Sequence, residues 1–353
     1  MKKVLILTTA LVATASVAAA DVRFSGYGRF GLDYNSENDE GVGGNGVRTT
    51  NLTSRLRLQV DMSTETDGGV GFNARFRAQA DSRNNRPGRS FTDPSGVTRI
   101  LSGGAEFNGA RFGVTYGGLT VNVGNIIGAV ENMPGLYLPT TSAGTGVDGS
   151  SFQSVVLNSA GDQFSWDAYS SGGIGANGLE ALYAVGGFTG HLSYSQTNVS
   201  APGANDAQTN VGLMLTYTFG DWTVSAARQQ SSLDGGTANP EELTAASIYG
   251  DIGMFGVGFA VGDNDGTYKY TLRGSVDVGP SGTLLAWVSQ EDDTTIAGTD
   301  FGGTSYGINY EYDLGGGVTL IAGAANYPST GGAPTGTDID DVTRAQTGVR
   351  FNF

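Results

Sequence analysis

The chain has 353 residues, no cysteine, and 19 basic against 34 acidic residues, which gives a formal net charge of −15. Without cysteine it can form neither disulfides nor thiolate metal sites, and its acid excess repels nucleic acid, so we expect no nucleic-acid partner. Its 58 glycines are accompanied by 15 tyrosines and 16 phenylalanines. This favours short strands and turns, because disordered glycine-rich chains lack aromatic residues.

Residues 1–20 have the pattern of a secretory signal peptide. Lys2 and Lys3 come before a mostly apolar stretch, residues 4–17, and residues 18–20 are all alanine. A basic start, an apolar centre and small residues at the cleavage point are typical of such signals, and the apolar part is too short for a membrane-spanning helix. We expect the mature chain to begin at Asp21, with 333 residues (353 minus 20) and a formal charge of −17 from 17 basic (19 minus 2) and 34 acidic residues.

The first mature segment alternates between two kinds of side chain. Phe24, Phe30 and Leu32 share one parity, whereas Arg23 and Arg29 take the other. Because successive side chains of a strand point to opposite faces, one face of this strand is apolar and the other polar. The same alternation, with no charge on the apolar face, covers residues 22–34, 52–62, 70–79, 306–314 and 344–353. In a membrane this matters, since an Arg or Lys that faces lipid at the midplane costs about 2–4 kcal/mol.

Short and long connections alternate along the chain. Seven short joints recur, at residues 64–68, 117–118, 186–187, 220–221, 253–254, 279–282 and 315–317. Between them lie mostly longer stretches, at residues 36–48, 81–104, 127–177, 197–208, 232–242, 264–266, 292–302 and 328–341. Short periplasmic turns and longer outer loops are typical of outer-membrane barrels. Seven turns and eight loops therefore predict an all-β fold, a sixteen-stranded antiparallel transmembrane β-barrel over residues 21–353.

A soluble β-sandwich also alternates, but it has no reason to gather aromatic residues at one end. Here they flank the short joints and the chain end, as in the aromatic girdle of a membrane interface: Tyr116, Phe219, Trp222, Phe255, Tyr312 and Phe353.

Two regions of the predicted barrel are ambiguous. Leu284 and Leu285 leave the phase of residues 283–290 undecided, and residues 163–170 alternate like a further strand. A seventeenth strand would place one terminus outside, so we assign residues 163–170 to the third loop.

The signal-like start, the opening residues 22–29 (VRFSGYGR) and the closing residues 348–353 (GVRFNF) resemble the general porins of Rhodobacter-type alphaproteobacteria. The resemblance covers the whole chain and is most specific at its two ends and at the Gly-Gly turns. It implies a diffusion channel for ions and small hydrophilic solutes in the outer membrane of a Gram-negative bacterium. It also implies a homotrimer in which each third loop, about residues 127–177, folds inward to narrow the pore. Phe353, Phe351 and Val349 match the terminal signal that is read by the barrel-assembly machinery.

Sixteen strands enclose a water-filled channel rather than a packed interior, so the lining of its narrowest point decides what passes. Arginines take the polar parity near mid-height of the first three strands, and others extend the patch toward the closing strand: Arg29, Arg55, Arg57, Arg75 and Arg77, with Arg23, Arg344 and Arg350. Because arginine keeps its charge and its planar head can stack, we expect a basic wall on one side of the pore. The alternative is an ordinary solvated face with local partners such as Asp33 and Asp61.

The opposing negative charge is expected from the third loop. Glu131 is the first candidate, with Asp148 and Asp162 behind it. The Debye length is about 8 Å at physiological salt, comparable with a pore constriction, so a field between wall and loop would be only partly screened. We therefore predict a transverse field that orients polar solutes. The resemblance points to a loop rich in acids, whereas this one holds only a few.

An acid cluster in the first outer loop has two interpretations. It consists of Glu37, Asp39 and Glu40. Oxygen-rich loops can bind calcium, and divalent ions bridge lipopolysaccharide, so the cluster could hold structural calcium at a lipopolysaccharide surface. We favour the simpler interpretation, in which the acids keep an exposed loop soluble and the protein has no cofactor.

Three other functions stay open. An outer-membrane hydrolase needs a nucleophile, a base and an orienting group; the single histidine, His191, has polar strand parity and no serine motif accompanies it, so we do not expect an enzyme. A solute-specific channel with a binding site in the lumen would carry a ladder of inward aromatics, and only Tyr27, Tyr249 and Tyr169 take that phase. A non-channel barrel, such as an adhesin, would show no conductance.

Overall fold

The computed structural model describes residues 20–39, 47–82, 90–92, 98–100, 104–157, 166–171, 175–196, 207–234, 241–296, 299–328 and 341–353. The first strands in these ranges are β1 (Asp21–Asn35), β2 (Thr50–Glu65), β3 (Gly71–Asp81), β4 (Ser90–Thr92), β5 (Thr98–Ile100), β6 (Gly104–Phe107), β7 (Arg111–Tyr116), β8 (Leu119–Gly124) and β9 (Gly178–Val185). The others are β10 (Phe188–Gln196), β11 (Ala207–Phe219), β12 (Trp222–Asp234), β13 (Glu241–Ile252), β14 (Phe255–Asn264), β15 (Thr267–Val278), β16 (Gly282–Ile296), β17 (Thr299–Gly315), β18 (Val318–Pro328) and β19 (Asp341–Asn352). In the same ranges no helix is long and apolar enough to cross a membrane.

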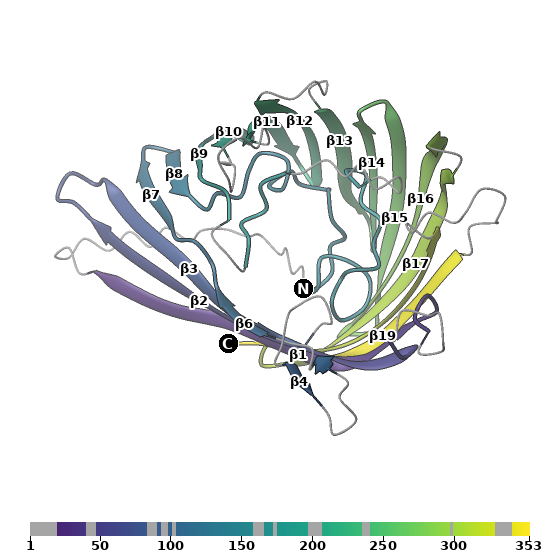
Figure 1. Cartoon of the computed structure of the whole chain (residues 1–353). Coiled ribbons are helices and arrows are strands. Elements are labelled where there is room, and N and C mark those ends of the chain that lie inside the picture. Colours follow the sequence, from purple (N-terminus) through teal and green to yellow (C-terminus); the bar gives the residue numbers. More distant parts are fainter. Residues whose placement is uncertain are drawn as a thin grey trace.

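The main sheet closes on itself because its last strand pairs with its first (Figure 1). β1 lies between β2 and β19, with Phe30 opposite Ser54 on one side and Val349 on the other. β6 and β7 pair with two parts of the same neighbour, β3, so they form one interrupted strand. With that pair counted once, the ring has sixteen antiparallel strands, and β4 and β5 pair separately. The predicted sixteen-stranded β-barrel is confirmed.

The two faces of the barrel wall carry different side chains. Phe24 is 65% and Phe30 54% exposed on the outer face, whereas Tyr27 and Arg29, at the alternate parity, are buried inside the ring. The orientation of β16, which the sequence left undecided, is settled by Leu285, because this side chain is buried in a cluster inside the barrel. Strand alternation then turns its neighbour outward. Residues 166–170 contain no strand, and residues 163–165 lie outside the described ranges.

The short joints follow from glycine. Gly117 and Gly118 between β7 and β8 both have positive φ, 54° and 85°, and Gly186 and Gly187 between β9 and β10 repeat this with 54° and 88°. Two successive residues with positive φ make the tight turn whose twist matches a two-strand ribbon. All seven short joints of the sequence fall at connections between consecutive, paired strands, with residues 64, 65, 282 and 315 still inside strand ends.

The seam between β1 and β19 is closed by backbone and by aromatic rings. The Gly26 N–H donates to the Phe353 carbonyl at 2.9 Å, and the Phe353 N–H donates back at 3.0 Å. On the outer face Gly26 and Gly28 have no side chains, and the rings of Phe353 and Phe351 fill that space. The chain end thus packs against the strand that begins the barrel.

Candidate functional site

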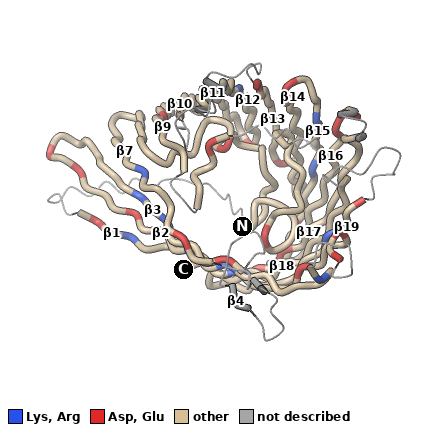
Figure 2. Tube along the Cα trace, viewed as in Figure 1, with Lys and Arg blue, Asp and Glu red and all other residues tan. Residues whose placement is uncertain are grey.

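The structure places the arginines of the expected basic wall on four adjacent strands, β19, β1, β2 and β3. Figure 2 shows basic residues on β1, β2, β3 and β7 on one side of the ring, and further basic residues on β15 across from them. Arg29 lies directly opposite Arg55 in β2 and opposite Arg350 in β19. These positions share the inner face, because the outer face of the same strands carries apolar side chains such as Phe30.

One arginine of β2 and one of β3 are paired with carboxylates across these two strands. Arg55 Nη2 lies 2.6 Å from Asp81 Oδ2, and this aspartate side chain is 2% exposed. Arg75 is paired with Asp61, and both side chains remain partly exposed. The charge of these two arginines is therefore partly balanced at close range.

Arg57 and Arg77 make reciprocal contacts with glutamines across β2 and β3. Arg57 Nε donates to Gln79 Oε1 at 2.8 Å, and Arg77 Nε donates to Gln59 Oε1 at 3.0 Å. Each arginine lies opposite its glutamine in the strand register. A neutral amide orients a guanidinium without cancelling its charge, so these contacts keep positive charge on the inner face.

The ends of the expected wall have other surroundings. Arg29 Nη1 donates to the Val147 carbonyl at 3.3 Å, and Arg350 Nη1 donates to the Thr141 carbonyl. Both carbonyls belong to the segment between β8 and β9, residues 125–177, which is called the third loop here. Arg23 is exposed near the start of β1.

The described part of the third loop, residues 125–157, 166–171 and 175–177, runs inside the ring of strands (Figure 1). Its backbone is hydrogen-bonded to inward side chains around most of the barrel. These side chains include Arg29, Arg77, Glu180, Ser193, Ser247, Asn264, Lys269, Arg273, Ser289, Asn309, Glu311, Gln346 and Arg350. Contacts to the main chain at so many points fix the path of the described part of the loop.

Glu180 of β9 holds the base of the third loop. Its Oε2 accepts hydrogen bonds from the Ile127 and Gly128 N–H groups, both at 3.1 Å, and lies 3.2 Å from His191 Nε2. Its Oε1 lies 3.5 Å from Arg111 Nη1. Sequence reasoning did not single out Glu180; the signal was an isolated acid with inward parity on a strand next to the single histidine.

One side of the third loop packs on an apolar part of the inner wall. The first cluster joins loop residues to β11, β12, β13 and β14: Ala129, Val130, Met133, Leu136, Val155 and Val156, with Met214, Ala227, Leu243, Ala245 and Ala260. A second cluster joins the loop to β16 and β18: Leu138 and Phe152, with Leu285, Trp287 and Ala325. The apolar contacts therefore hold these parts of the loop on strands other than β2 and β3, while Tyr169, later in the loop, contacts Arg77 on β3.

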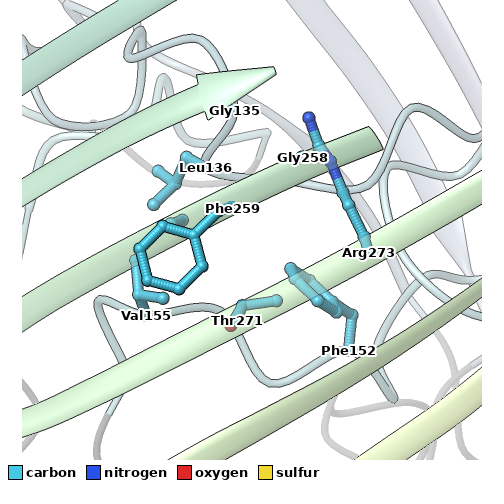
Figure 3. Close-up of a pocket in the computed structure, with 9 residues that line it drawn as sticks. Gly135, Leu136, Phe152, Val155, Gly258, Phe259, Thr271 and Arg273 are labelled. Atoms are coloured by element: carbon cyan, nitrogen blue, oxygen red, sulfur yellow. The ribbon is translucent and has the colours of Figure 1, made fainter. Parts of the chain in front are cut away.

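A small cavity remains between the third loop and strands β14 and β15 (Figure 3). Leu136, Phe152 and Val155 line it from the loop, and Thr271 and Arg273 line it from β15. Its volume of about 10 Å³ is about what a single water molecule needs. It is a packing gap behind the loop and has no room for a solute.

Glu131, the first of the expected loop acids, is engaged within the loop itself. Its Oε2 accepts hydrogen bonds from Tyr137 Oη at 2.5 Å and from Trp166 Nε1 at 2.8 Å. Burial raises the pKa of this carboxyl, although the two hydrogen bonds and the charge of Arg77 act in the opposite direction. The charge of Glu131 is thus held in a largely dehydrated setting.

Asp148, the second loop acid, is bound to the closing strand. Its Oδ2 lies 3.0 Å from Arg344 Nη2, and its Oδ1 accepts from the Ser150 hydroxyl at 2.6 Å. Burial opposes ionisation of this carboxyl, but the Arg344 charge and the Ser150 hydrogen bonds outweigh it and lower the pKa to about 2. Arg344 also pairs with Asp33 at 2.8 Å. Asp162, the third expected acid, lies outside the described residues.

The acid cluster of the first outer loop is only partly described. Glu37 and Asp39 follow β1, and Glu40 lies outside the described residues. The Glu37 N–H donates to Asn35 Oδ1 at 3.0 Å, which is a turn contact. Within the described ranges, no three histidine or carboxylate side chains are gathered as metal ligands.

Comparisons with known proteins agree on one family. The family model described as Gram-negative porin matches residues 7–332. A porin of Fuscovulum blasticum is 30% identical over 343 residues, which cover 94% of this chain and 100% of that protein, and a porin of Rhodobacter capsulatus is 25% identical over 356 residues with the same coverage. A solved triple mutant of Rhodopseudomonas blastica porin is similar to this chain with a TM-score of 0.68 and 26% identity, covering 94% of this chain and all of that one.

Proposed function

The chain belongs to the Gram-negative porin family and is an outer-membrane diffusion channel for small solutes, and we propose that its arginine wall decides which ions pass most easily. The observation that carries this proposal is an asymmetry of the lumen. Arg57 and Arg77 lie on β2 and β3, whereas the apolar residues of the third loop pack against β11–β14, β16 and β18, and a later loop residue, Tyr169, contacts Arg77. Solutes that pass between loop and wall therefore meet positive charge on one side.

The loop acids are proposed to act as the weaker partners of this wall. Asp148 is neutralised at close range by Arg344, and Glu131 is held by two neutral donors, the groups of Tyr137 and Trp166. Asp162 is proposed to contribute from the same loop. With this balance the transverse field is dominated by its positive side, and we expect a preference for anions.

Ion selectivity tests the proposal directly. The variant with Arg55, Arg57, Arg75 and Arg77 all replaced by alanine is inserted into planar lipid bilayers, and its reversal potential is measured in a salt gradient. We expect the potential to shift toward cations, because four fixed positive charges leave the inner face. The matched control is Arg228→Ala, since Arg228 lies on the outer face and is paired with Glu242 at 2.7 Å. An unchanged potential in the fourfold variant would contradict the proposal.

Four further properties are proposed from the family and the sequence. We propose that the protein has no enzymatic activity, which incubation with lipid and peptide substrates tests. We propose that it assembles as a homotrimer, which native mass spectrometry in detergent tests. Phe353, Phe351 and Val349 are proposed as the signal for the barrel-assembly machinery, supported by the packing of the two rings on β1. Residues 1–20 are proposed to be cleaved in the periplasm, so N-terminal sequencing of the purified protein should begin at Asp21.

The first outer loop is proposed to face lipopolysaccharide without needing a cofactor. Structural calcium at Glu37, Asp39 and Glu40 is the alternative. A calcium titration that raises the melting temperature, and loses this effect in Glu37→Gln, would favour calcium. A melting temperature that does not respond leaves solubility as the role of these acids.

A further inference from the structure

Tyr27 brings two arginines of the wall together. It lies inside the barrel on β1 and is 8% exposed. The guanidinium carbon of Arg350 is 3.9 Å and that of Arg57 is 5.1 Å from the centre of its ring. These arginines come from β19 and β2, the two strands that flank β1. The ring therefore lies between two positive charges whose strands are separated by β1.

Tyr169 repeats this arrangement from the third loop. The guanidinium carbons of Arg77 on β3 and Arg111 on β7 lie 4.4 and 5.0 Å from its ring centre. β3 and β7 are paired strands, so Tyr169 also stands between arginines from adjacent positions of the wall. The side chain is 3% exposed. Two tyrosines from different parts of the chain thus each contact two arginines.

The backbone of Tyr169 is held in an unfavourable conformation. Its φ is +46°, a left-handed value that side chains with a Cβ seldom adopt. The Tyr169 N–H donates to the Ile126 carbonyl at 3.0 Å, and the next carbonyl, of Ser170, accepts from Asn108 at 2.6 Å and from Asn125 at 3.1 Å. Such strain persists only where surrounding contacts impose it, and it concentrates at functional sites. Here the contacts aim one ring at two arginines.

A neutral ring stabilises neighbouring cations in a way that no carboxylate does. The face of an aromatic ring attracts a guanidinium without cancelling its charge. Carboxylates are close by: Glu180 lies 3.5 Å from Arg111, and Glu311 binds the N–H of Thr141, whose carbonyl accepts from Arg350. Without the rings, repulsion within each arginine pair would drive these side chains toward the acids, and less positive charge would face the pore.

We propose that Tyr27 and Tyr169 are specificity-determining residues, which hold Arg57, Arg350, Arg77 and Arg111 at fixed separations and so set the strength of the anion preference. This inference rests on the proposed function, in which the arginine wall governs ion selectivity. It adds that the number of arginines alone does not determine the anion preference, because the positions of these arginines depend on two aromatic spacers. At Tyr169 the effect requires the ring and not the hydroxyl, because Tyr169 Oη is buried without a partner. Tyr27 Oη in addition accepts a hydrogen bond from Arg55 Nη1 at 3.4 Å, so the phenylalanine variant separates the ring from this contact.

The test compares leucine with phenylalanine at both positions in the full-length protein. The double variant Tyr27→Leu/Tyr169→Leu is inserted into planar bilayers, and its reversal potential in a potassium chloride gradient should shift toward cations, in the direction of Arg57→Ala/Arg77→Ala. The variant Tyr27→Phe/Tyr169→Phe should restore most of the wild-type value. Tyr194→Leu makes the same chemical change on the outer face, where Tyr194 is 43% exposed, and should leave the potential unchanged.

The outcomes separate the inference from the function on which it rests. If the arginine variant shifts the potential and the double leucine variant does not, the spacer role is overturned and the wall remains. If neither shifts it, the proposed function itself fails. A shift of equal size in the phenylalanine variant would also overturn the role of the rings. The single variants Tyr27→Leu and Tyr169→Leu carry the same prediction, with a smaller shift each, should the double variant fail to form a barrel.

Discussion

Glu180 and His191 form an enclosed pair beneath the start of the third loop, with Oε2 and Nε2 3.2 Å apart and neither side chain exposed. The same Glu180 oxygen accepts the Ile127 and Gly128 N–H groups. The carboxylate therefore joins two adjacent strands to the point where the chain leaves the barrel wall for the lumen. The position of the loop inside the barrel depends on where this segment is fixed.

Glu180→Ala should release the base of the third loop. Two loop N–H groups lose their acceptor, and a buried donor left unsatisfied costs about 1–3 kcal/mol. We expect noisier single-channel currents and a changed mean conductance, measured in planar bilayers. Glu65→Ala, at the exposed end of β2, removes a carboxylate far from the loop and should leave both unchanged. Quiet, wild-type currents in Glu180→Ala would show that the other contacts suffice.

Asp148 should stabilise the protein above about pH 4 and cease to do so in strong acid. Its pKa is lowered to about 2 by the Arg344 charge and the Ser150 hydrogen bonds, in spite of burial. A lowered carboxyl pKa adds stability that is present above the unfolded value and is lost as the pH falls through the folded value. From the size of the shift we expect about 2 kcal/mol. Thermal unfolding in detergent should lose this pH dependence in Asp148→Asn and keep it in Asp67→Asn, on an exposed turn.

Glu131 should make the ion preference depend on pH. Burial raises the pKa of this carboxyl, so it takes up a proton at a higher pH than a free glutamate does. As the pH falls through the raised value, the loop loses a negative charge, and the preference for anions should increase. Reversal potentials recorded from about pH 8 down to about pH 4 should show this change. Glu131→Gln should behave at every pH as the wild type does at low pH; a pH response that survives in this variant must come from another group.

Leu243 should be needed to hold the third loop on the inner wall. It is fully buried in the cluster that joins β13 to the loop, and truncating a buried leucine to alanine costs about 2–5 kcal/mol. Leu243→Ala should therefore make the loop more accessible to proteases and alter conductance, while the barrel remains folded. Leu213→Ala on the outer face, where Leu213 is 47% exposed, tests whether loss of leucine alone has this effect.

Gly28→Val should hinder closure of the barrel. A Cβ at Gly28 would collide with the ring of Phe351, which covers that glycine at the seam. We expect a smaller fraction of protein in the heat-modifiable, folded band on a gel after refolding. Gly274→Val is the matched control, because Gly274 lies on a strand with only a carbonyl at 3.9 Å near its missing Cβ. Equal folded fractions for both variants would show that the packing of Phe351 on Gly28 does not limit closure of the barrel.

The barrel could be predicted from the sequence because the side chains of each strand alternate according to the environment that they face. Lipid on one side and water on the other select alternating side chains, as in Phe24, Arg29 and Phe30, and glycine pairs mark the short turns. These signals are local, so no knowledge of distant residues is needed. The sixteen strands, the short joints and the inward arginines of β1–β3 follow from them.

The path of the third loop could not be predicted in the same way. Leu243, Leu285 and Trp287 have inward parity although they are apolar, and only the packing of the loop explains them. The available signal for loop packing was an apolar residue at a position whose parity is otherwise polar. At Leu285 this signal only left the orientation of the strand undecided. Arg344 was expected to extend the open wall. Its partner Asp148 is 196 residues away, and no sequence pattern specifies that pairing.

The seam between Gly26 and Phe353 has a consequence for how the protein is made. β19, which completes the ring, follows the other strands of the barrel in the sequence, so a chain that stops before it has two edge strands whose backbone N–H and C=O groups lack partners. Such rows are templates for pairing with other molecules. A chain that lacks β19 is thus an open, aggregation-prone sheet and not a slightly smaller channel, and the cell must keep the chain shielded until the twelve residues of β19 have been made.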